Sequence, residues 1–428
     1  MYRRCFIILF VGLLACPLAA ADFQPDTIYS RWVINSHLGH FNNKSVSIGF
    51  KTDTSRCTAQ WDYVPGLVAK GVLKACEQYQ DQSWAQPWFE SMYDYALHAQ
   101  MKVGLNNIDD LNAAKIFFEL YRGALRRGDQ QHASFFRQQV DSARNILKYH
   151  HRRISANLPG SGGFWHKNIY PNQMWLDGLY MGTAMYGEWQ GNFDPDDTAS
   201  WNDIAAQFDT IFVHTWDADK QLCYHAWSAQ PMDKRSVAWA DSVTGRSSEF
   251  WARGMGWYFA ALIDVLEYMP ANQPSRRRLE QIVGMVADGL RARQDASGCW
   301  YQLLQYNDAL RGSCGQFNYL ESSASSMYAY CYLKGIRIGV LDPVKYMPVA
   351  QRAYRGLIEQ FVQTEPDGTI SLINSCESAG LSAKRIGDAD YYLCGSDVVI
   401  NHQTEGKVLG PFIMASLEYE RLSESRQP

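Results

Sequence analysis

The feature that most constrains this chain is a helical spacing of apolar residues that recurs over almost its whole length. In residues 110–121 the apolar side chains gather on one face of a helix, and do not alternate as they would in a strand. The same spacing predicts helices at about 26–38, 61–78, 82–98, 130–150, 172–188, 198–216, 250–269, 274–293, 317–338, 343–363 and 409–424. Most of these segments are joined by short links that contain Gly, Pro or Asp, residues that end helices.

Helices in series with short links predict repeated helical hairpins. Six such hairpins closed into a ring form an all-α (α/α)6 barrel, in which inner helices surround a cavity and outer helices cover them. An open superhelical array is the alternative, but the sequence has no fixed repeat period. No Ser-, Pro- or Gly-rich linker divides the chain, so we expect residues 22–428 to form one domain.

Four longer stretches lack the helical spacing and hold much of the Gly, Asp, His and Trp content. They are residues 151–171, 217–249, 294–316 and 364–408. Loops of this length inside a compact domain are usually functional. On a ring of hairpins they would gather at one mouth of the cavity, where we expect the chemistry to take place.

Residues 1–21 have the features of an export signal. Arg3 and Arg4 give a positive start, residues 6–14 are apolar, and Ala19 to Ala21 form a small-residue cleavage site. The apolar run is much shorter than the ~20 residues that cross a bilayer, and no later segment is long and apolar enough to span one. We therefore expect an exported protein, periplasmic or secreted.

A second interpretation of the same segment is a lipid anchor. The sequence from Leu13 to Cys16 resembles a bacterial lipoprotein box, which would place the lipid on Cys16. Pro17, directly after that cysteine, favours simple cleavage. On either interpretation the protein leaves the cytoplasm.

Composition excludes some partners and favours others. The formal net charge is −4 and no run of basic residues exists, so the chain is poorly suited to nucleic acid. Beyond the export signal the cysteines form no Cys-x-x-Cys pair and no zinc-like spacing with His, so we expect mostly buried thiols and no metal or cofactor. Aromatic residues reach 14%, and flat rings stack on sugars as well as filling cores.

Asp177 is the first candidate for chemistry. It lies near the start of a predicted inner helix, beside Trp175 and close in sequence to Trp165 and Tyr180. A carboxylate at that position often caps the helix. Alternatively, aromatic neighbours desolvate the carboxyl group and raise its pKa, which suits a general acid.

Several cationic or polar side chains could accompany this acid. His166 and Lys167 precede it and would supply hydrogen-bond donors or positive charge. Arg253 lies four residues before Trp257, so the two share a helical face and could bind a sugar carboxylate by a bidentate contact with stacking. The alternative is an ordinary arginine packed on tryptophan.

The strings QMWLDGLYM, ending at Met181, and FWARGMGW, ending at Trp257, closely resemble the unsaturated rhamnogalacturonyl hydrolases of glycoside hydrolase family 105. That family is related to the unsaturated glucuronyl hydrolases of family 88. Further matches occur at Gly298–Gln302, Asn318–Ala324 and Gly410–Arg421. The matches keep their order over about residues 60–424, nearly the whole chain after the export signal.

The resemblance implies an (α/α)6 barrel and an unusual hydrolysis that needs no metal or cofactor. Polysaccharide lyases leave a C4=C5 double bond in the terminal uronic acid of their products. Enzymes of this family hydrate that bond and so release the sugar. The resemblance implies a pectin-degrading enzyme that acts on rhamnogalacturonan-derived oligosaccharides.

Site residues follow from the same resemblance. The catalytic aspartate of the family falls on Asp177, which would protonate C4 and then activate water. His225, Arg253 and Trp257 match positions that line the pocket, as do His166 and Lys167. Tyr63 is expected on the cavity wall.

One further polar position remains open between two residues. The related glucuronyl hydrolases place a second important aspartate in a segment that corresponds to 107–114 here. Asn112 is the expected counterpart and Asp109 the alternative. Gln305 departs from the pattern, because an acidic residue is expected there.

Two other functions remain open. The same site could act on unsaturated glucuronyl residues from ulvan or glycosaminoglycan lyase products. A non-catalytic oligosaccharide-binding relative is the alternative outside the enzyme class, although such a protein would not need Asp177. The sequence does not determine the oligomeric state.

Overall fold

The computed structural model describes residues 21–37, 61–79, 81–98 and 107–424. Residues 1–20 of the predicted export signal, Cys16 among them, lie outside the described part of the chain. All the helices predicted from periodicity are present in the described part, with some boundaries shifted. Within the described residues no helix is long and apolar enough to cross a membrane.

The inner helices form a closed ring. They are α2 (Tyr63–Gln78), α4 (Ile116–Arg126), α7 (Ala184–Phe193), α9 (Ala252–Tyr268), α11 (Ser322–Arg337) and α14 (Gly406–Glu424). Each inner helix, together with the turn that precedes it, packs against the next, and α14 packs against α2. This closure confirms the barrel and excludes an open array.

Each inner helix is covered by one outer helix. The outer helices are α1 (Tyr29–His37), α3 (Gln82–His98), α5 (Gln130–Asn145), α8 (Thr198–Thr215), α10 (Arg276–Arg291) and α12 (Pro343–Phe361). In this layer α1 covers α14, and α3, α5, α8, α10 and α12 cover the inner helix that precedes each of them in the chain. The fold is therefore an (α/α)6 barrel.

Burial along the helices matches the two layers. Along α9 nearly every side chain from Ala252 to Leu266 is buried, as expected of a helix enclosed on all sides. On α10 the buried residues form one stripe that includes Leu279, Ile282 and Val286. The apolar core thus lies where the helices of the inner ring pack against one another and against the outer helices.

Two predicted helix starts are wrong, each for a local reason. The segment 172–188 begins with a short strand, β1 (Gln173–Trp175), which pairs with β4 (Ala226–Ser228). The segment 317–338 becomes helical only at Ser322, because the Glu321 side chain accepts hydrogen bonds from the backbone N–H groups of Ser323 and Ala324 and so caps the helix there.

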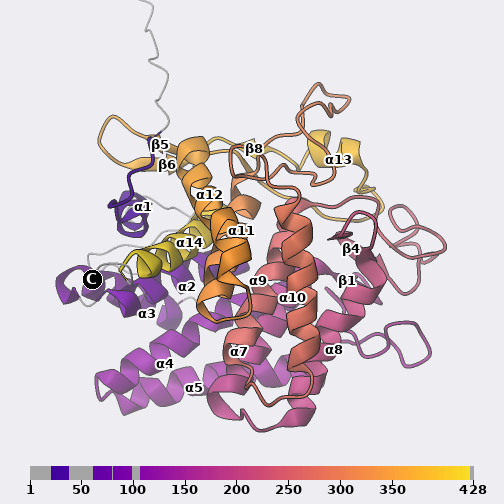
Figure 1. The fold of residues 1–428 in the computed structure, drawn as a ribbon. Helices are drawn as coiled ribbons and strands as arrows, with labels where there is room; N and C mark the ends of the chain where they lie inside the picture. Colours follow the sequence, from indigo (N-terminus) through magenta and orange to yellow (C-terminus); the bar gives the residue numbers. More distant parts are fainter. Residues whose placement is uncertain (1–20, 38–60, 80, 99–106, 425–428) are drawn as a thin grey trace, which may run out of the picture.

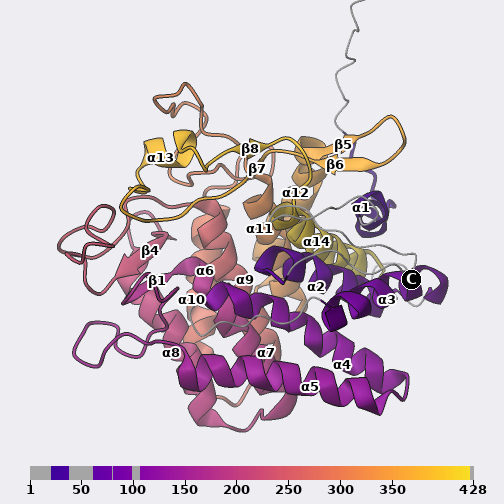
Figure 2. The same cartoon turned by 180° about the vertical axis from the view of Figure 1, so that it is seen from behind.

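The long loops carry the remaining elements. Three more two-stranded pairs are β2 (Trp216–Asp217) with β3 (Leu222–Cys223), β5 (Val362–Thr364) with β6 (Ile370–Leu372), and β7 (Ser375–Cys376) with β8 (Ile400–Asn401). A short helix, α13 (Ala389–Cys394), was not predicted. Figures 1 and 2 show α13 and strands β5 to β8 at one end of the barrel.

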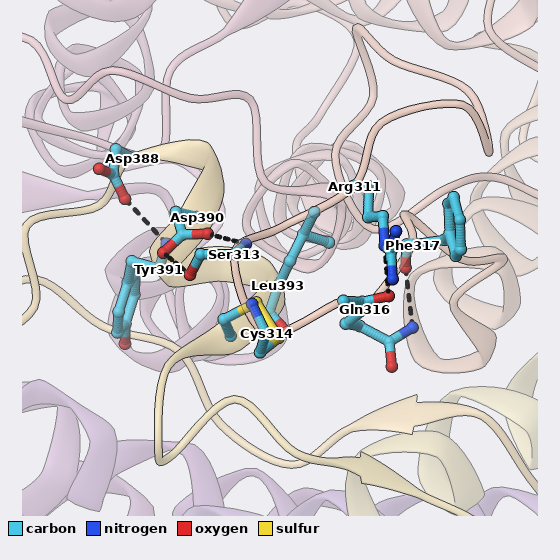
Figure 3. The surroundings of a disulfide bond; sticks show 11 residues. Arg311, Ser313, Cys314, Gln316, Phe317, Asp388, Asp390, Tyr391 and Leu393 are labelled. Atoms are coloured by element: carbon cyan, nitrogen blue, oxygen red, sulfur yellow. Dashed lines mark hydrogen bonds between the residues drawn. A yellow bond between two sulfur atoms is a disulfide. The ribbon is translucent and has the colours of Figure 1, made fainter.

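The cysteines are mostly thiols, as predicted, with one exception among those described. Cys314 and Cys394 form a disulfide that joins the loop 294–316 to the end of α13 (Figure 3). Five others carry free thiols, and all but Cys76 are fully buried. The bridge spans 80 residues of sequence, so no local pattern marks the pair.

Candidate active site

The pairing of β1 with β4 brings Asp177 and His225 together. Trp175, at the end of β1, lies opposite Ala226, at the start of β4, and the backbone N–H of Leu176 donates to the carbonyl of His225 at 3.1 Å. The Nε2 atom of His225 then lies 3.1 Å from Oδ2 of Asp177. Two residues that are 48 positions apart thus form one hydrogen-bonded unit.

Asp177 stands in the first helical turn after β1, as the sequence predicted. This turn is α6 (Leu176–Gly178), and it continues into a π-helical turn, η3 (Leu179–Thr183), before α7 begins. π-Helical turns inside α-helices occur frequently at functional sites. The first turn of a helix also favours a negative charge, because its free N–H groups point toward it.

The predicted rise in the pKa of Asp177 is wrong. Burial does raise the pKa of this carboxyl, but the charge and hydrogen bond of His225 outweigh burial, and the pKa lies below its ordinary value. The sequence did not indicate His225 as the partner, because it lies 48 residues from Asp177. Asp177 is therefore a carboxylate near pH 7.

Asp109 enters the site from a 3₁₀ turn, η1 (Ile108–Lys115), that precedes α4. Its Oδ2 lies 2.6 Å from Nζ of Lys167, and its Oδ1 lies 3.9 Å from Nε2 of His166. A backbone bridge between Asn107 and Lys167 holds the two loops together. The second carboxylate of the pocket is thus paired with a lysine.

His166 and Lys167 differ in charge although they are neighbours. Burial lowers the pKa of His166 to about 4, so its ring is neutral near pH 7. That ring stacks on Trp175 at 4.5 Å between centroids. Burial also disfavours the charge on Lys167, but Asp109 outweighs burial and raises the pKa of the lysine. Lys167 is therefore the cation of this pair.

A pocket of about 150 Å³ opens between these groups. Seven of the predicted site residues line it: Tyr63, Asp109, His166, Lys167, Asp177, Arg253 and Trp257. The other lining residues are Tyr170, Trp175, Met181, Trp251, Ser378, Ala379, Gly380 and Arg385. A larger hollow of about 420 Å³, bordered by α2, α3 and α4, contains none of the predicted site residues.

Two predicted residues do not line the pocket. His225 is fully buried behind Asp177 and acts on it from the protein side. Asn112 is also buried, and its Nδ2 donates to the backbone carbonyl of Tyr63 at 3.0 Å. Of the two candidates on this segment, Asp109 is the one that reaches the pocket.

Arg253 borders the pocket, but its hydrogen bonds go to the protein. The guanidinium donates to Oγ of Ser323 and to the backbone carbonyls of Cys376 and Glu377. It lies over the ring of Trp251 at 4.8 Å, whereas Trp257 packs against Tyr180. Arg253 and Trp257 both border the pocket, but the guanidinium packs on Trp251, which agrees with the alternative of an arginine packed on tryptophan.

The segment 378–385 is a part of the site that the motifs did not indicate. Ser378, Ala379 and Gly380 follow β7 and border the pocket together with Arg385, whose Nε lies 3.1 Å from Oδ2 of Asp397. The only sequence signal was the length of the irregular stretch 364–408. Small residues here let the backbone approach a ligand closely.

Within the described residues no group of three or more His, Cys, Asp or Glu side chains is arranged to hold a metal ion. The charged groups that line the pocket are two carboxylates, Asp177 and Asp109, and the cations Lys167, Arg253 and Arg385. Tryptophan and tyrosine rings complete its walls. Such a lining suits a charged sugar.

A barrel of six helical hairpins with this carboxylate-bearing, aromatic pocket defines a glycoside hydrolase of the (α/α)6 type. Comparison with known proteins agrees: the chain belongs to glycosyl hydrolase family 88, whose family model matches residues 34–423. The predicted resemblance is thereby confirmed.

Three relatives show how far the similarity extends. A solved family 105 glycoside hydrolase from C. acetobutylicum ATCC 824 is 32% identical, with 92% of this chain and all of that chain covered and a TM-score of 0.74. A protein of Agrobacterium fabrum is 31% identical over 223 residues, which cover 50% of this chain and 89% of that protein. An unsaturated 3S-rhamnoglycuronyl hydrolase of Alteromonas sp. (strain LOR) is 25% identical over 151 residues, 35% of this chain and 33% of that protein.

Proposed function

We propose that this protein removes a terminal 4,5-unsaturated galacturonyl residue from rhamnogalacturonan-derived oligosaccharides by adding water across the C4=C5 bond. A proton goes to C4 and the oxygen of water goes to C5, which makes a hemiketal. The hemiketal opens to a ketone at C5 by breaking its bond to the ring oxygen. C1 then expels the glycosidic partner as an alcohol and becomes an aldehyde, so the overall reaction consumes one water.

The observation that carries this proposal is the Asp177–His225 pair at the wall of the pocket. His225 binds Oδ2 of Asp177, which leaves Oδ1 to exchange a proton with the substrate and with water. A single carboxyl group can serve as acid in the first step and as base in the second. The two-carboxylate spacing of ordinary glycosidases is therefore not required.

Substrate binding would favour the acid form of Asp177, which takes up its proton from solvent. Asp177 is ionised near pH 7, since its pKa lies below the ordinary value. A uronate carboxylate that enters the pocket brings a second negative charge close to it. Like charges disfavour ionisation, so the bound substrate raises the pKa of Asp177 and favours its acid form.

The size of the pocket supports removal of one terminal sugar. Its volume of about 150 Å³ is well below the ~300–1,000 Å³ typical of clefts that hold drug-sized ligands. One sugar ring therefore fits better than a chain of several. Lys167 and Arg385 at the pocket supply positive charge for the carboxylate of that ring.

The substrate class is tested by a panel of lyase products. Rhamnogalacturonan, ulvan and glycosaminoglycan digests are each incubated with the protein, while the ultraviolet absorbance of the C4=C5 chromophore is followed. The proposal expects the fastest loss with rhamnogalacturonan products. A preference for ulvan or glycosaminoglycan products would reassign the substrate, and no loss with any of them would favour an oligosaccharide-binding protein.

We also propose that the protein is exported, either to the periplasm or outside the cell. The Cys314–Cys394 disulfide supports this, because such bonds persist mainly in oxidising compartments. Fractionation of cells that express the full chain, combined with mass measurement of the mature N-terminus, tests export and separates cleavage after Ala21 from lipidation of Cys16.

A further inference from the structure

The short helix α13 contacts the active site through two adjacent tyrosines. The hydroxyl of Tyr392, a fully buried residue, lies 2.6 Å from Nδ1 of His225, whose Nε2 faces Asp177. The hydroxyl of Tyr391 accepts from the backbone N–H of Gly380 at 2.9 Å, and Gly380 borders the pocket. One helical turn thus reaches both the catalytic pair and the pocket wall.

This helix is fastened from the outside to the loop 294–316 (Figure 3). The carboxylate of Asp390 accepts hydrogen bonds from the backbone N–H and the hydroxyl of Ser313. The Cys314–Cys394 disulfide joins the same two segments, two residues after Tyr392. The contacts of Asp390 with Ser313 and the disulfide do not border the pocket, and the catalytic chemistry described above makes no use of them.

We propose that Tyr392 is a positioning residue that orients His225 against Asp177, and that the Cys314–Cys394 disulfide keeps the helix of Tyr392 in place. This inference deepens the proposed function and rests on it. Tyr392 would touch neither substrate nor water, so its effect passes through the histidine ring. The disulfide acts on Tyr392 by holding the helix that carries it.

The hydroxyl group is suited to this task because it can donate or accept. A carboxylate has no hydrogen to give, so Nε2 of His225 must donate to Asp177 while Asp177 is ionised. When the ring is neutral, Nδ1 then carries no hydrogen and needs a donor, which the Tyr392 hydroxyl provides. When the ring is protonated, Nδ1–H needs an acceptor, and the same hydroxyl accepts. The hydroxyl is therefore a suitable partner for Nδ1 whether or not that nitrogen carries hydrogen.

The surroundings leave His225 no other partner for Nδ1 among the hydrogen bonds of the described residues. The ring packs against Trp251 at 4.7 Å and against Trp175 at 5.4 Å between centroids, and these rings cannot replace the hydroxyl. Without Tyr392 the buried nitrogen would lack a partner, or the ring would rotate away from Asp177. Either change disturbs the pair.

The first test compares Tyr392→Phe with Tyr332→Phe. Tyr332 is equally buried, and its hydroxyl also makes one hydrogen bond, to the backbone carbonyl of Ala287 at 2.6 Å on the far side of α11. We expect Tyr392→Phe to lower kcat roughly tenfold to hundredfold with little change in KM, whereas Tyr332→Phe keeps wild-type kcat. Equal kcat values for the two variants would overturn the proposal.

The second test asks whether the disulfide acts through Tyr392. Cys314→Ser and Cys394→Ser are introduced together, once in the wild type and once in Tyr392→Phe. We expect kcat to fall roughly threefold or more in the wild-type background and hardly at all in the Tyr392→Phe background, because coupled residues are not additive. An equal fall in both backgrounds would show that the disulfide acts by another route.

A third measurement does not depend on any substrate. The nuclear magnetic resonance shifts of isotope-labelled histidine nitrogens report which ring nitrogen carries hydrogen, and His225→Gln identifies the signal. We expect the His225 signal to change in Tyr392→Phe and to stay unchanged in Tyr332→Phe. An unchanged signal in Tyr392→Phe refutes the positioning role. If the wild type instead hydrates no unsaturated uronide, the proposed function fails while this result still stands.

Discussion

Nε2 of His225 lies 3.1 Å from Oδ2 of Asp177, and this contact sets the charge of the candidate catalytic acid. The contact forms because β1 pairs with β4. This pairing places His225, the residue before β4, beside Asp177, which follows β1 by two positions. The histidine holds the pKa of the aspartate below its ordinary value although burial acts in the opposite direction. A negative charge that enters the pocket would therefore raise the pKa of Asp177 and favour its acid form.

Replacing His225 with Gln should move the pH dependence of the reaction. Gln can still donate a hydrogen bond but carries no positive charge, so the pKa of Asp177 rises. The limb on which kcat/KM falls as Asp177 loses its proton should shift to higher pH. The change is checked by pH profiles of both proteins, with His132→Gln on α5 as a control that leaves the limb in place. A shift to lower pH would contradict the account.

Asp109 and Asn112 should respond differently to substitution. Asp109→Asn removes the charge that pairs with Lys167 in the pocket, so we expect kcat/KM to fall roughly tenfold or more with little loss of stability. Asn112→Ala removes a buried hydrogen bond to Tyr63, so it should cost about 1–2 kcal/mol of unfolding free energy. Kinetics and urea unfolding of both variants check this. The reverse pattern would make Asn112 the functional residue.

Arg253→Lys should lower the stability of the protein. Lysine keeps the charge but cannot reach Ser323 and the backbone carbonyls of Cys376 and Glu377 at once. We therefore expect the free energy of unfolding to fall by about 1–3 kcal/mol. Arg278→Lys, which changes an exposed ion pair with Asp209, should cost under about 0.5 kcal/mol. Urea unfolding measures both. A higher KM for Arg253→Lys at unchanged stability would show direct contact with the substrate instead.

Glu249 should make stability depend on pH. Burial raises its pKa to about 7, so the folded state binds this proton more tightly than the unfolded state does. This tighter proton binding adds to the free energy of unfolding at pH values below the ordinary pKa of a glutamate. The added stability is lost as the pH rises toward 7. Glu249→Gln removes this loss and should stabilise the protein by on the order of 1–2 kcal/mol at about pH 8, with no gain at about pH 4. Unfolding curves at the two pH values decide the matter, and a gain at the lower pH alone would refute it.

Periodicity predicted the helices and the barrel because each helix extends over several turns of regular spacing. The strand β1 was missed because three residues are too few to form a pattern. The motif around Asp177 predicted a residue that lines the pocket, but the direction of its pKa shift depends on His225, which lies far away in sequence. Tyr392 and the segment 378–385 reach the site through tertiary packing, so the length of the irregular stretch 364–408 indicated the region but not the residues.

The most direct test of the central claim compares wild type with Asp177→Asn on the lyase product that the wild type consumes fastest. The amide fills the same space and can still meet His225, but it cannot supply a proton to C4 or accept one from water. We expect the ultraviolet absorbance of the C4=C5 bond to disappear with wild type and to persist with the variant, with kcat lower by roughly a thousandfold or more. Loss of absorbance at comparable rates in both proteins would contradict the assignment of Asp177 as the catalytic acid.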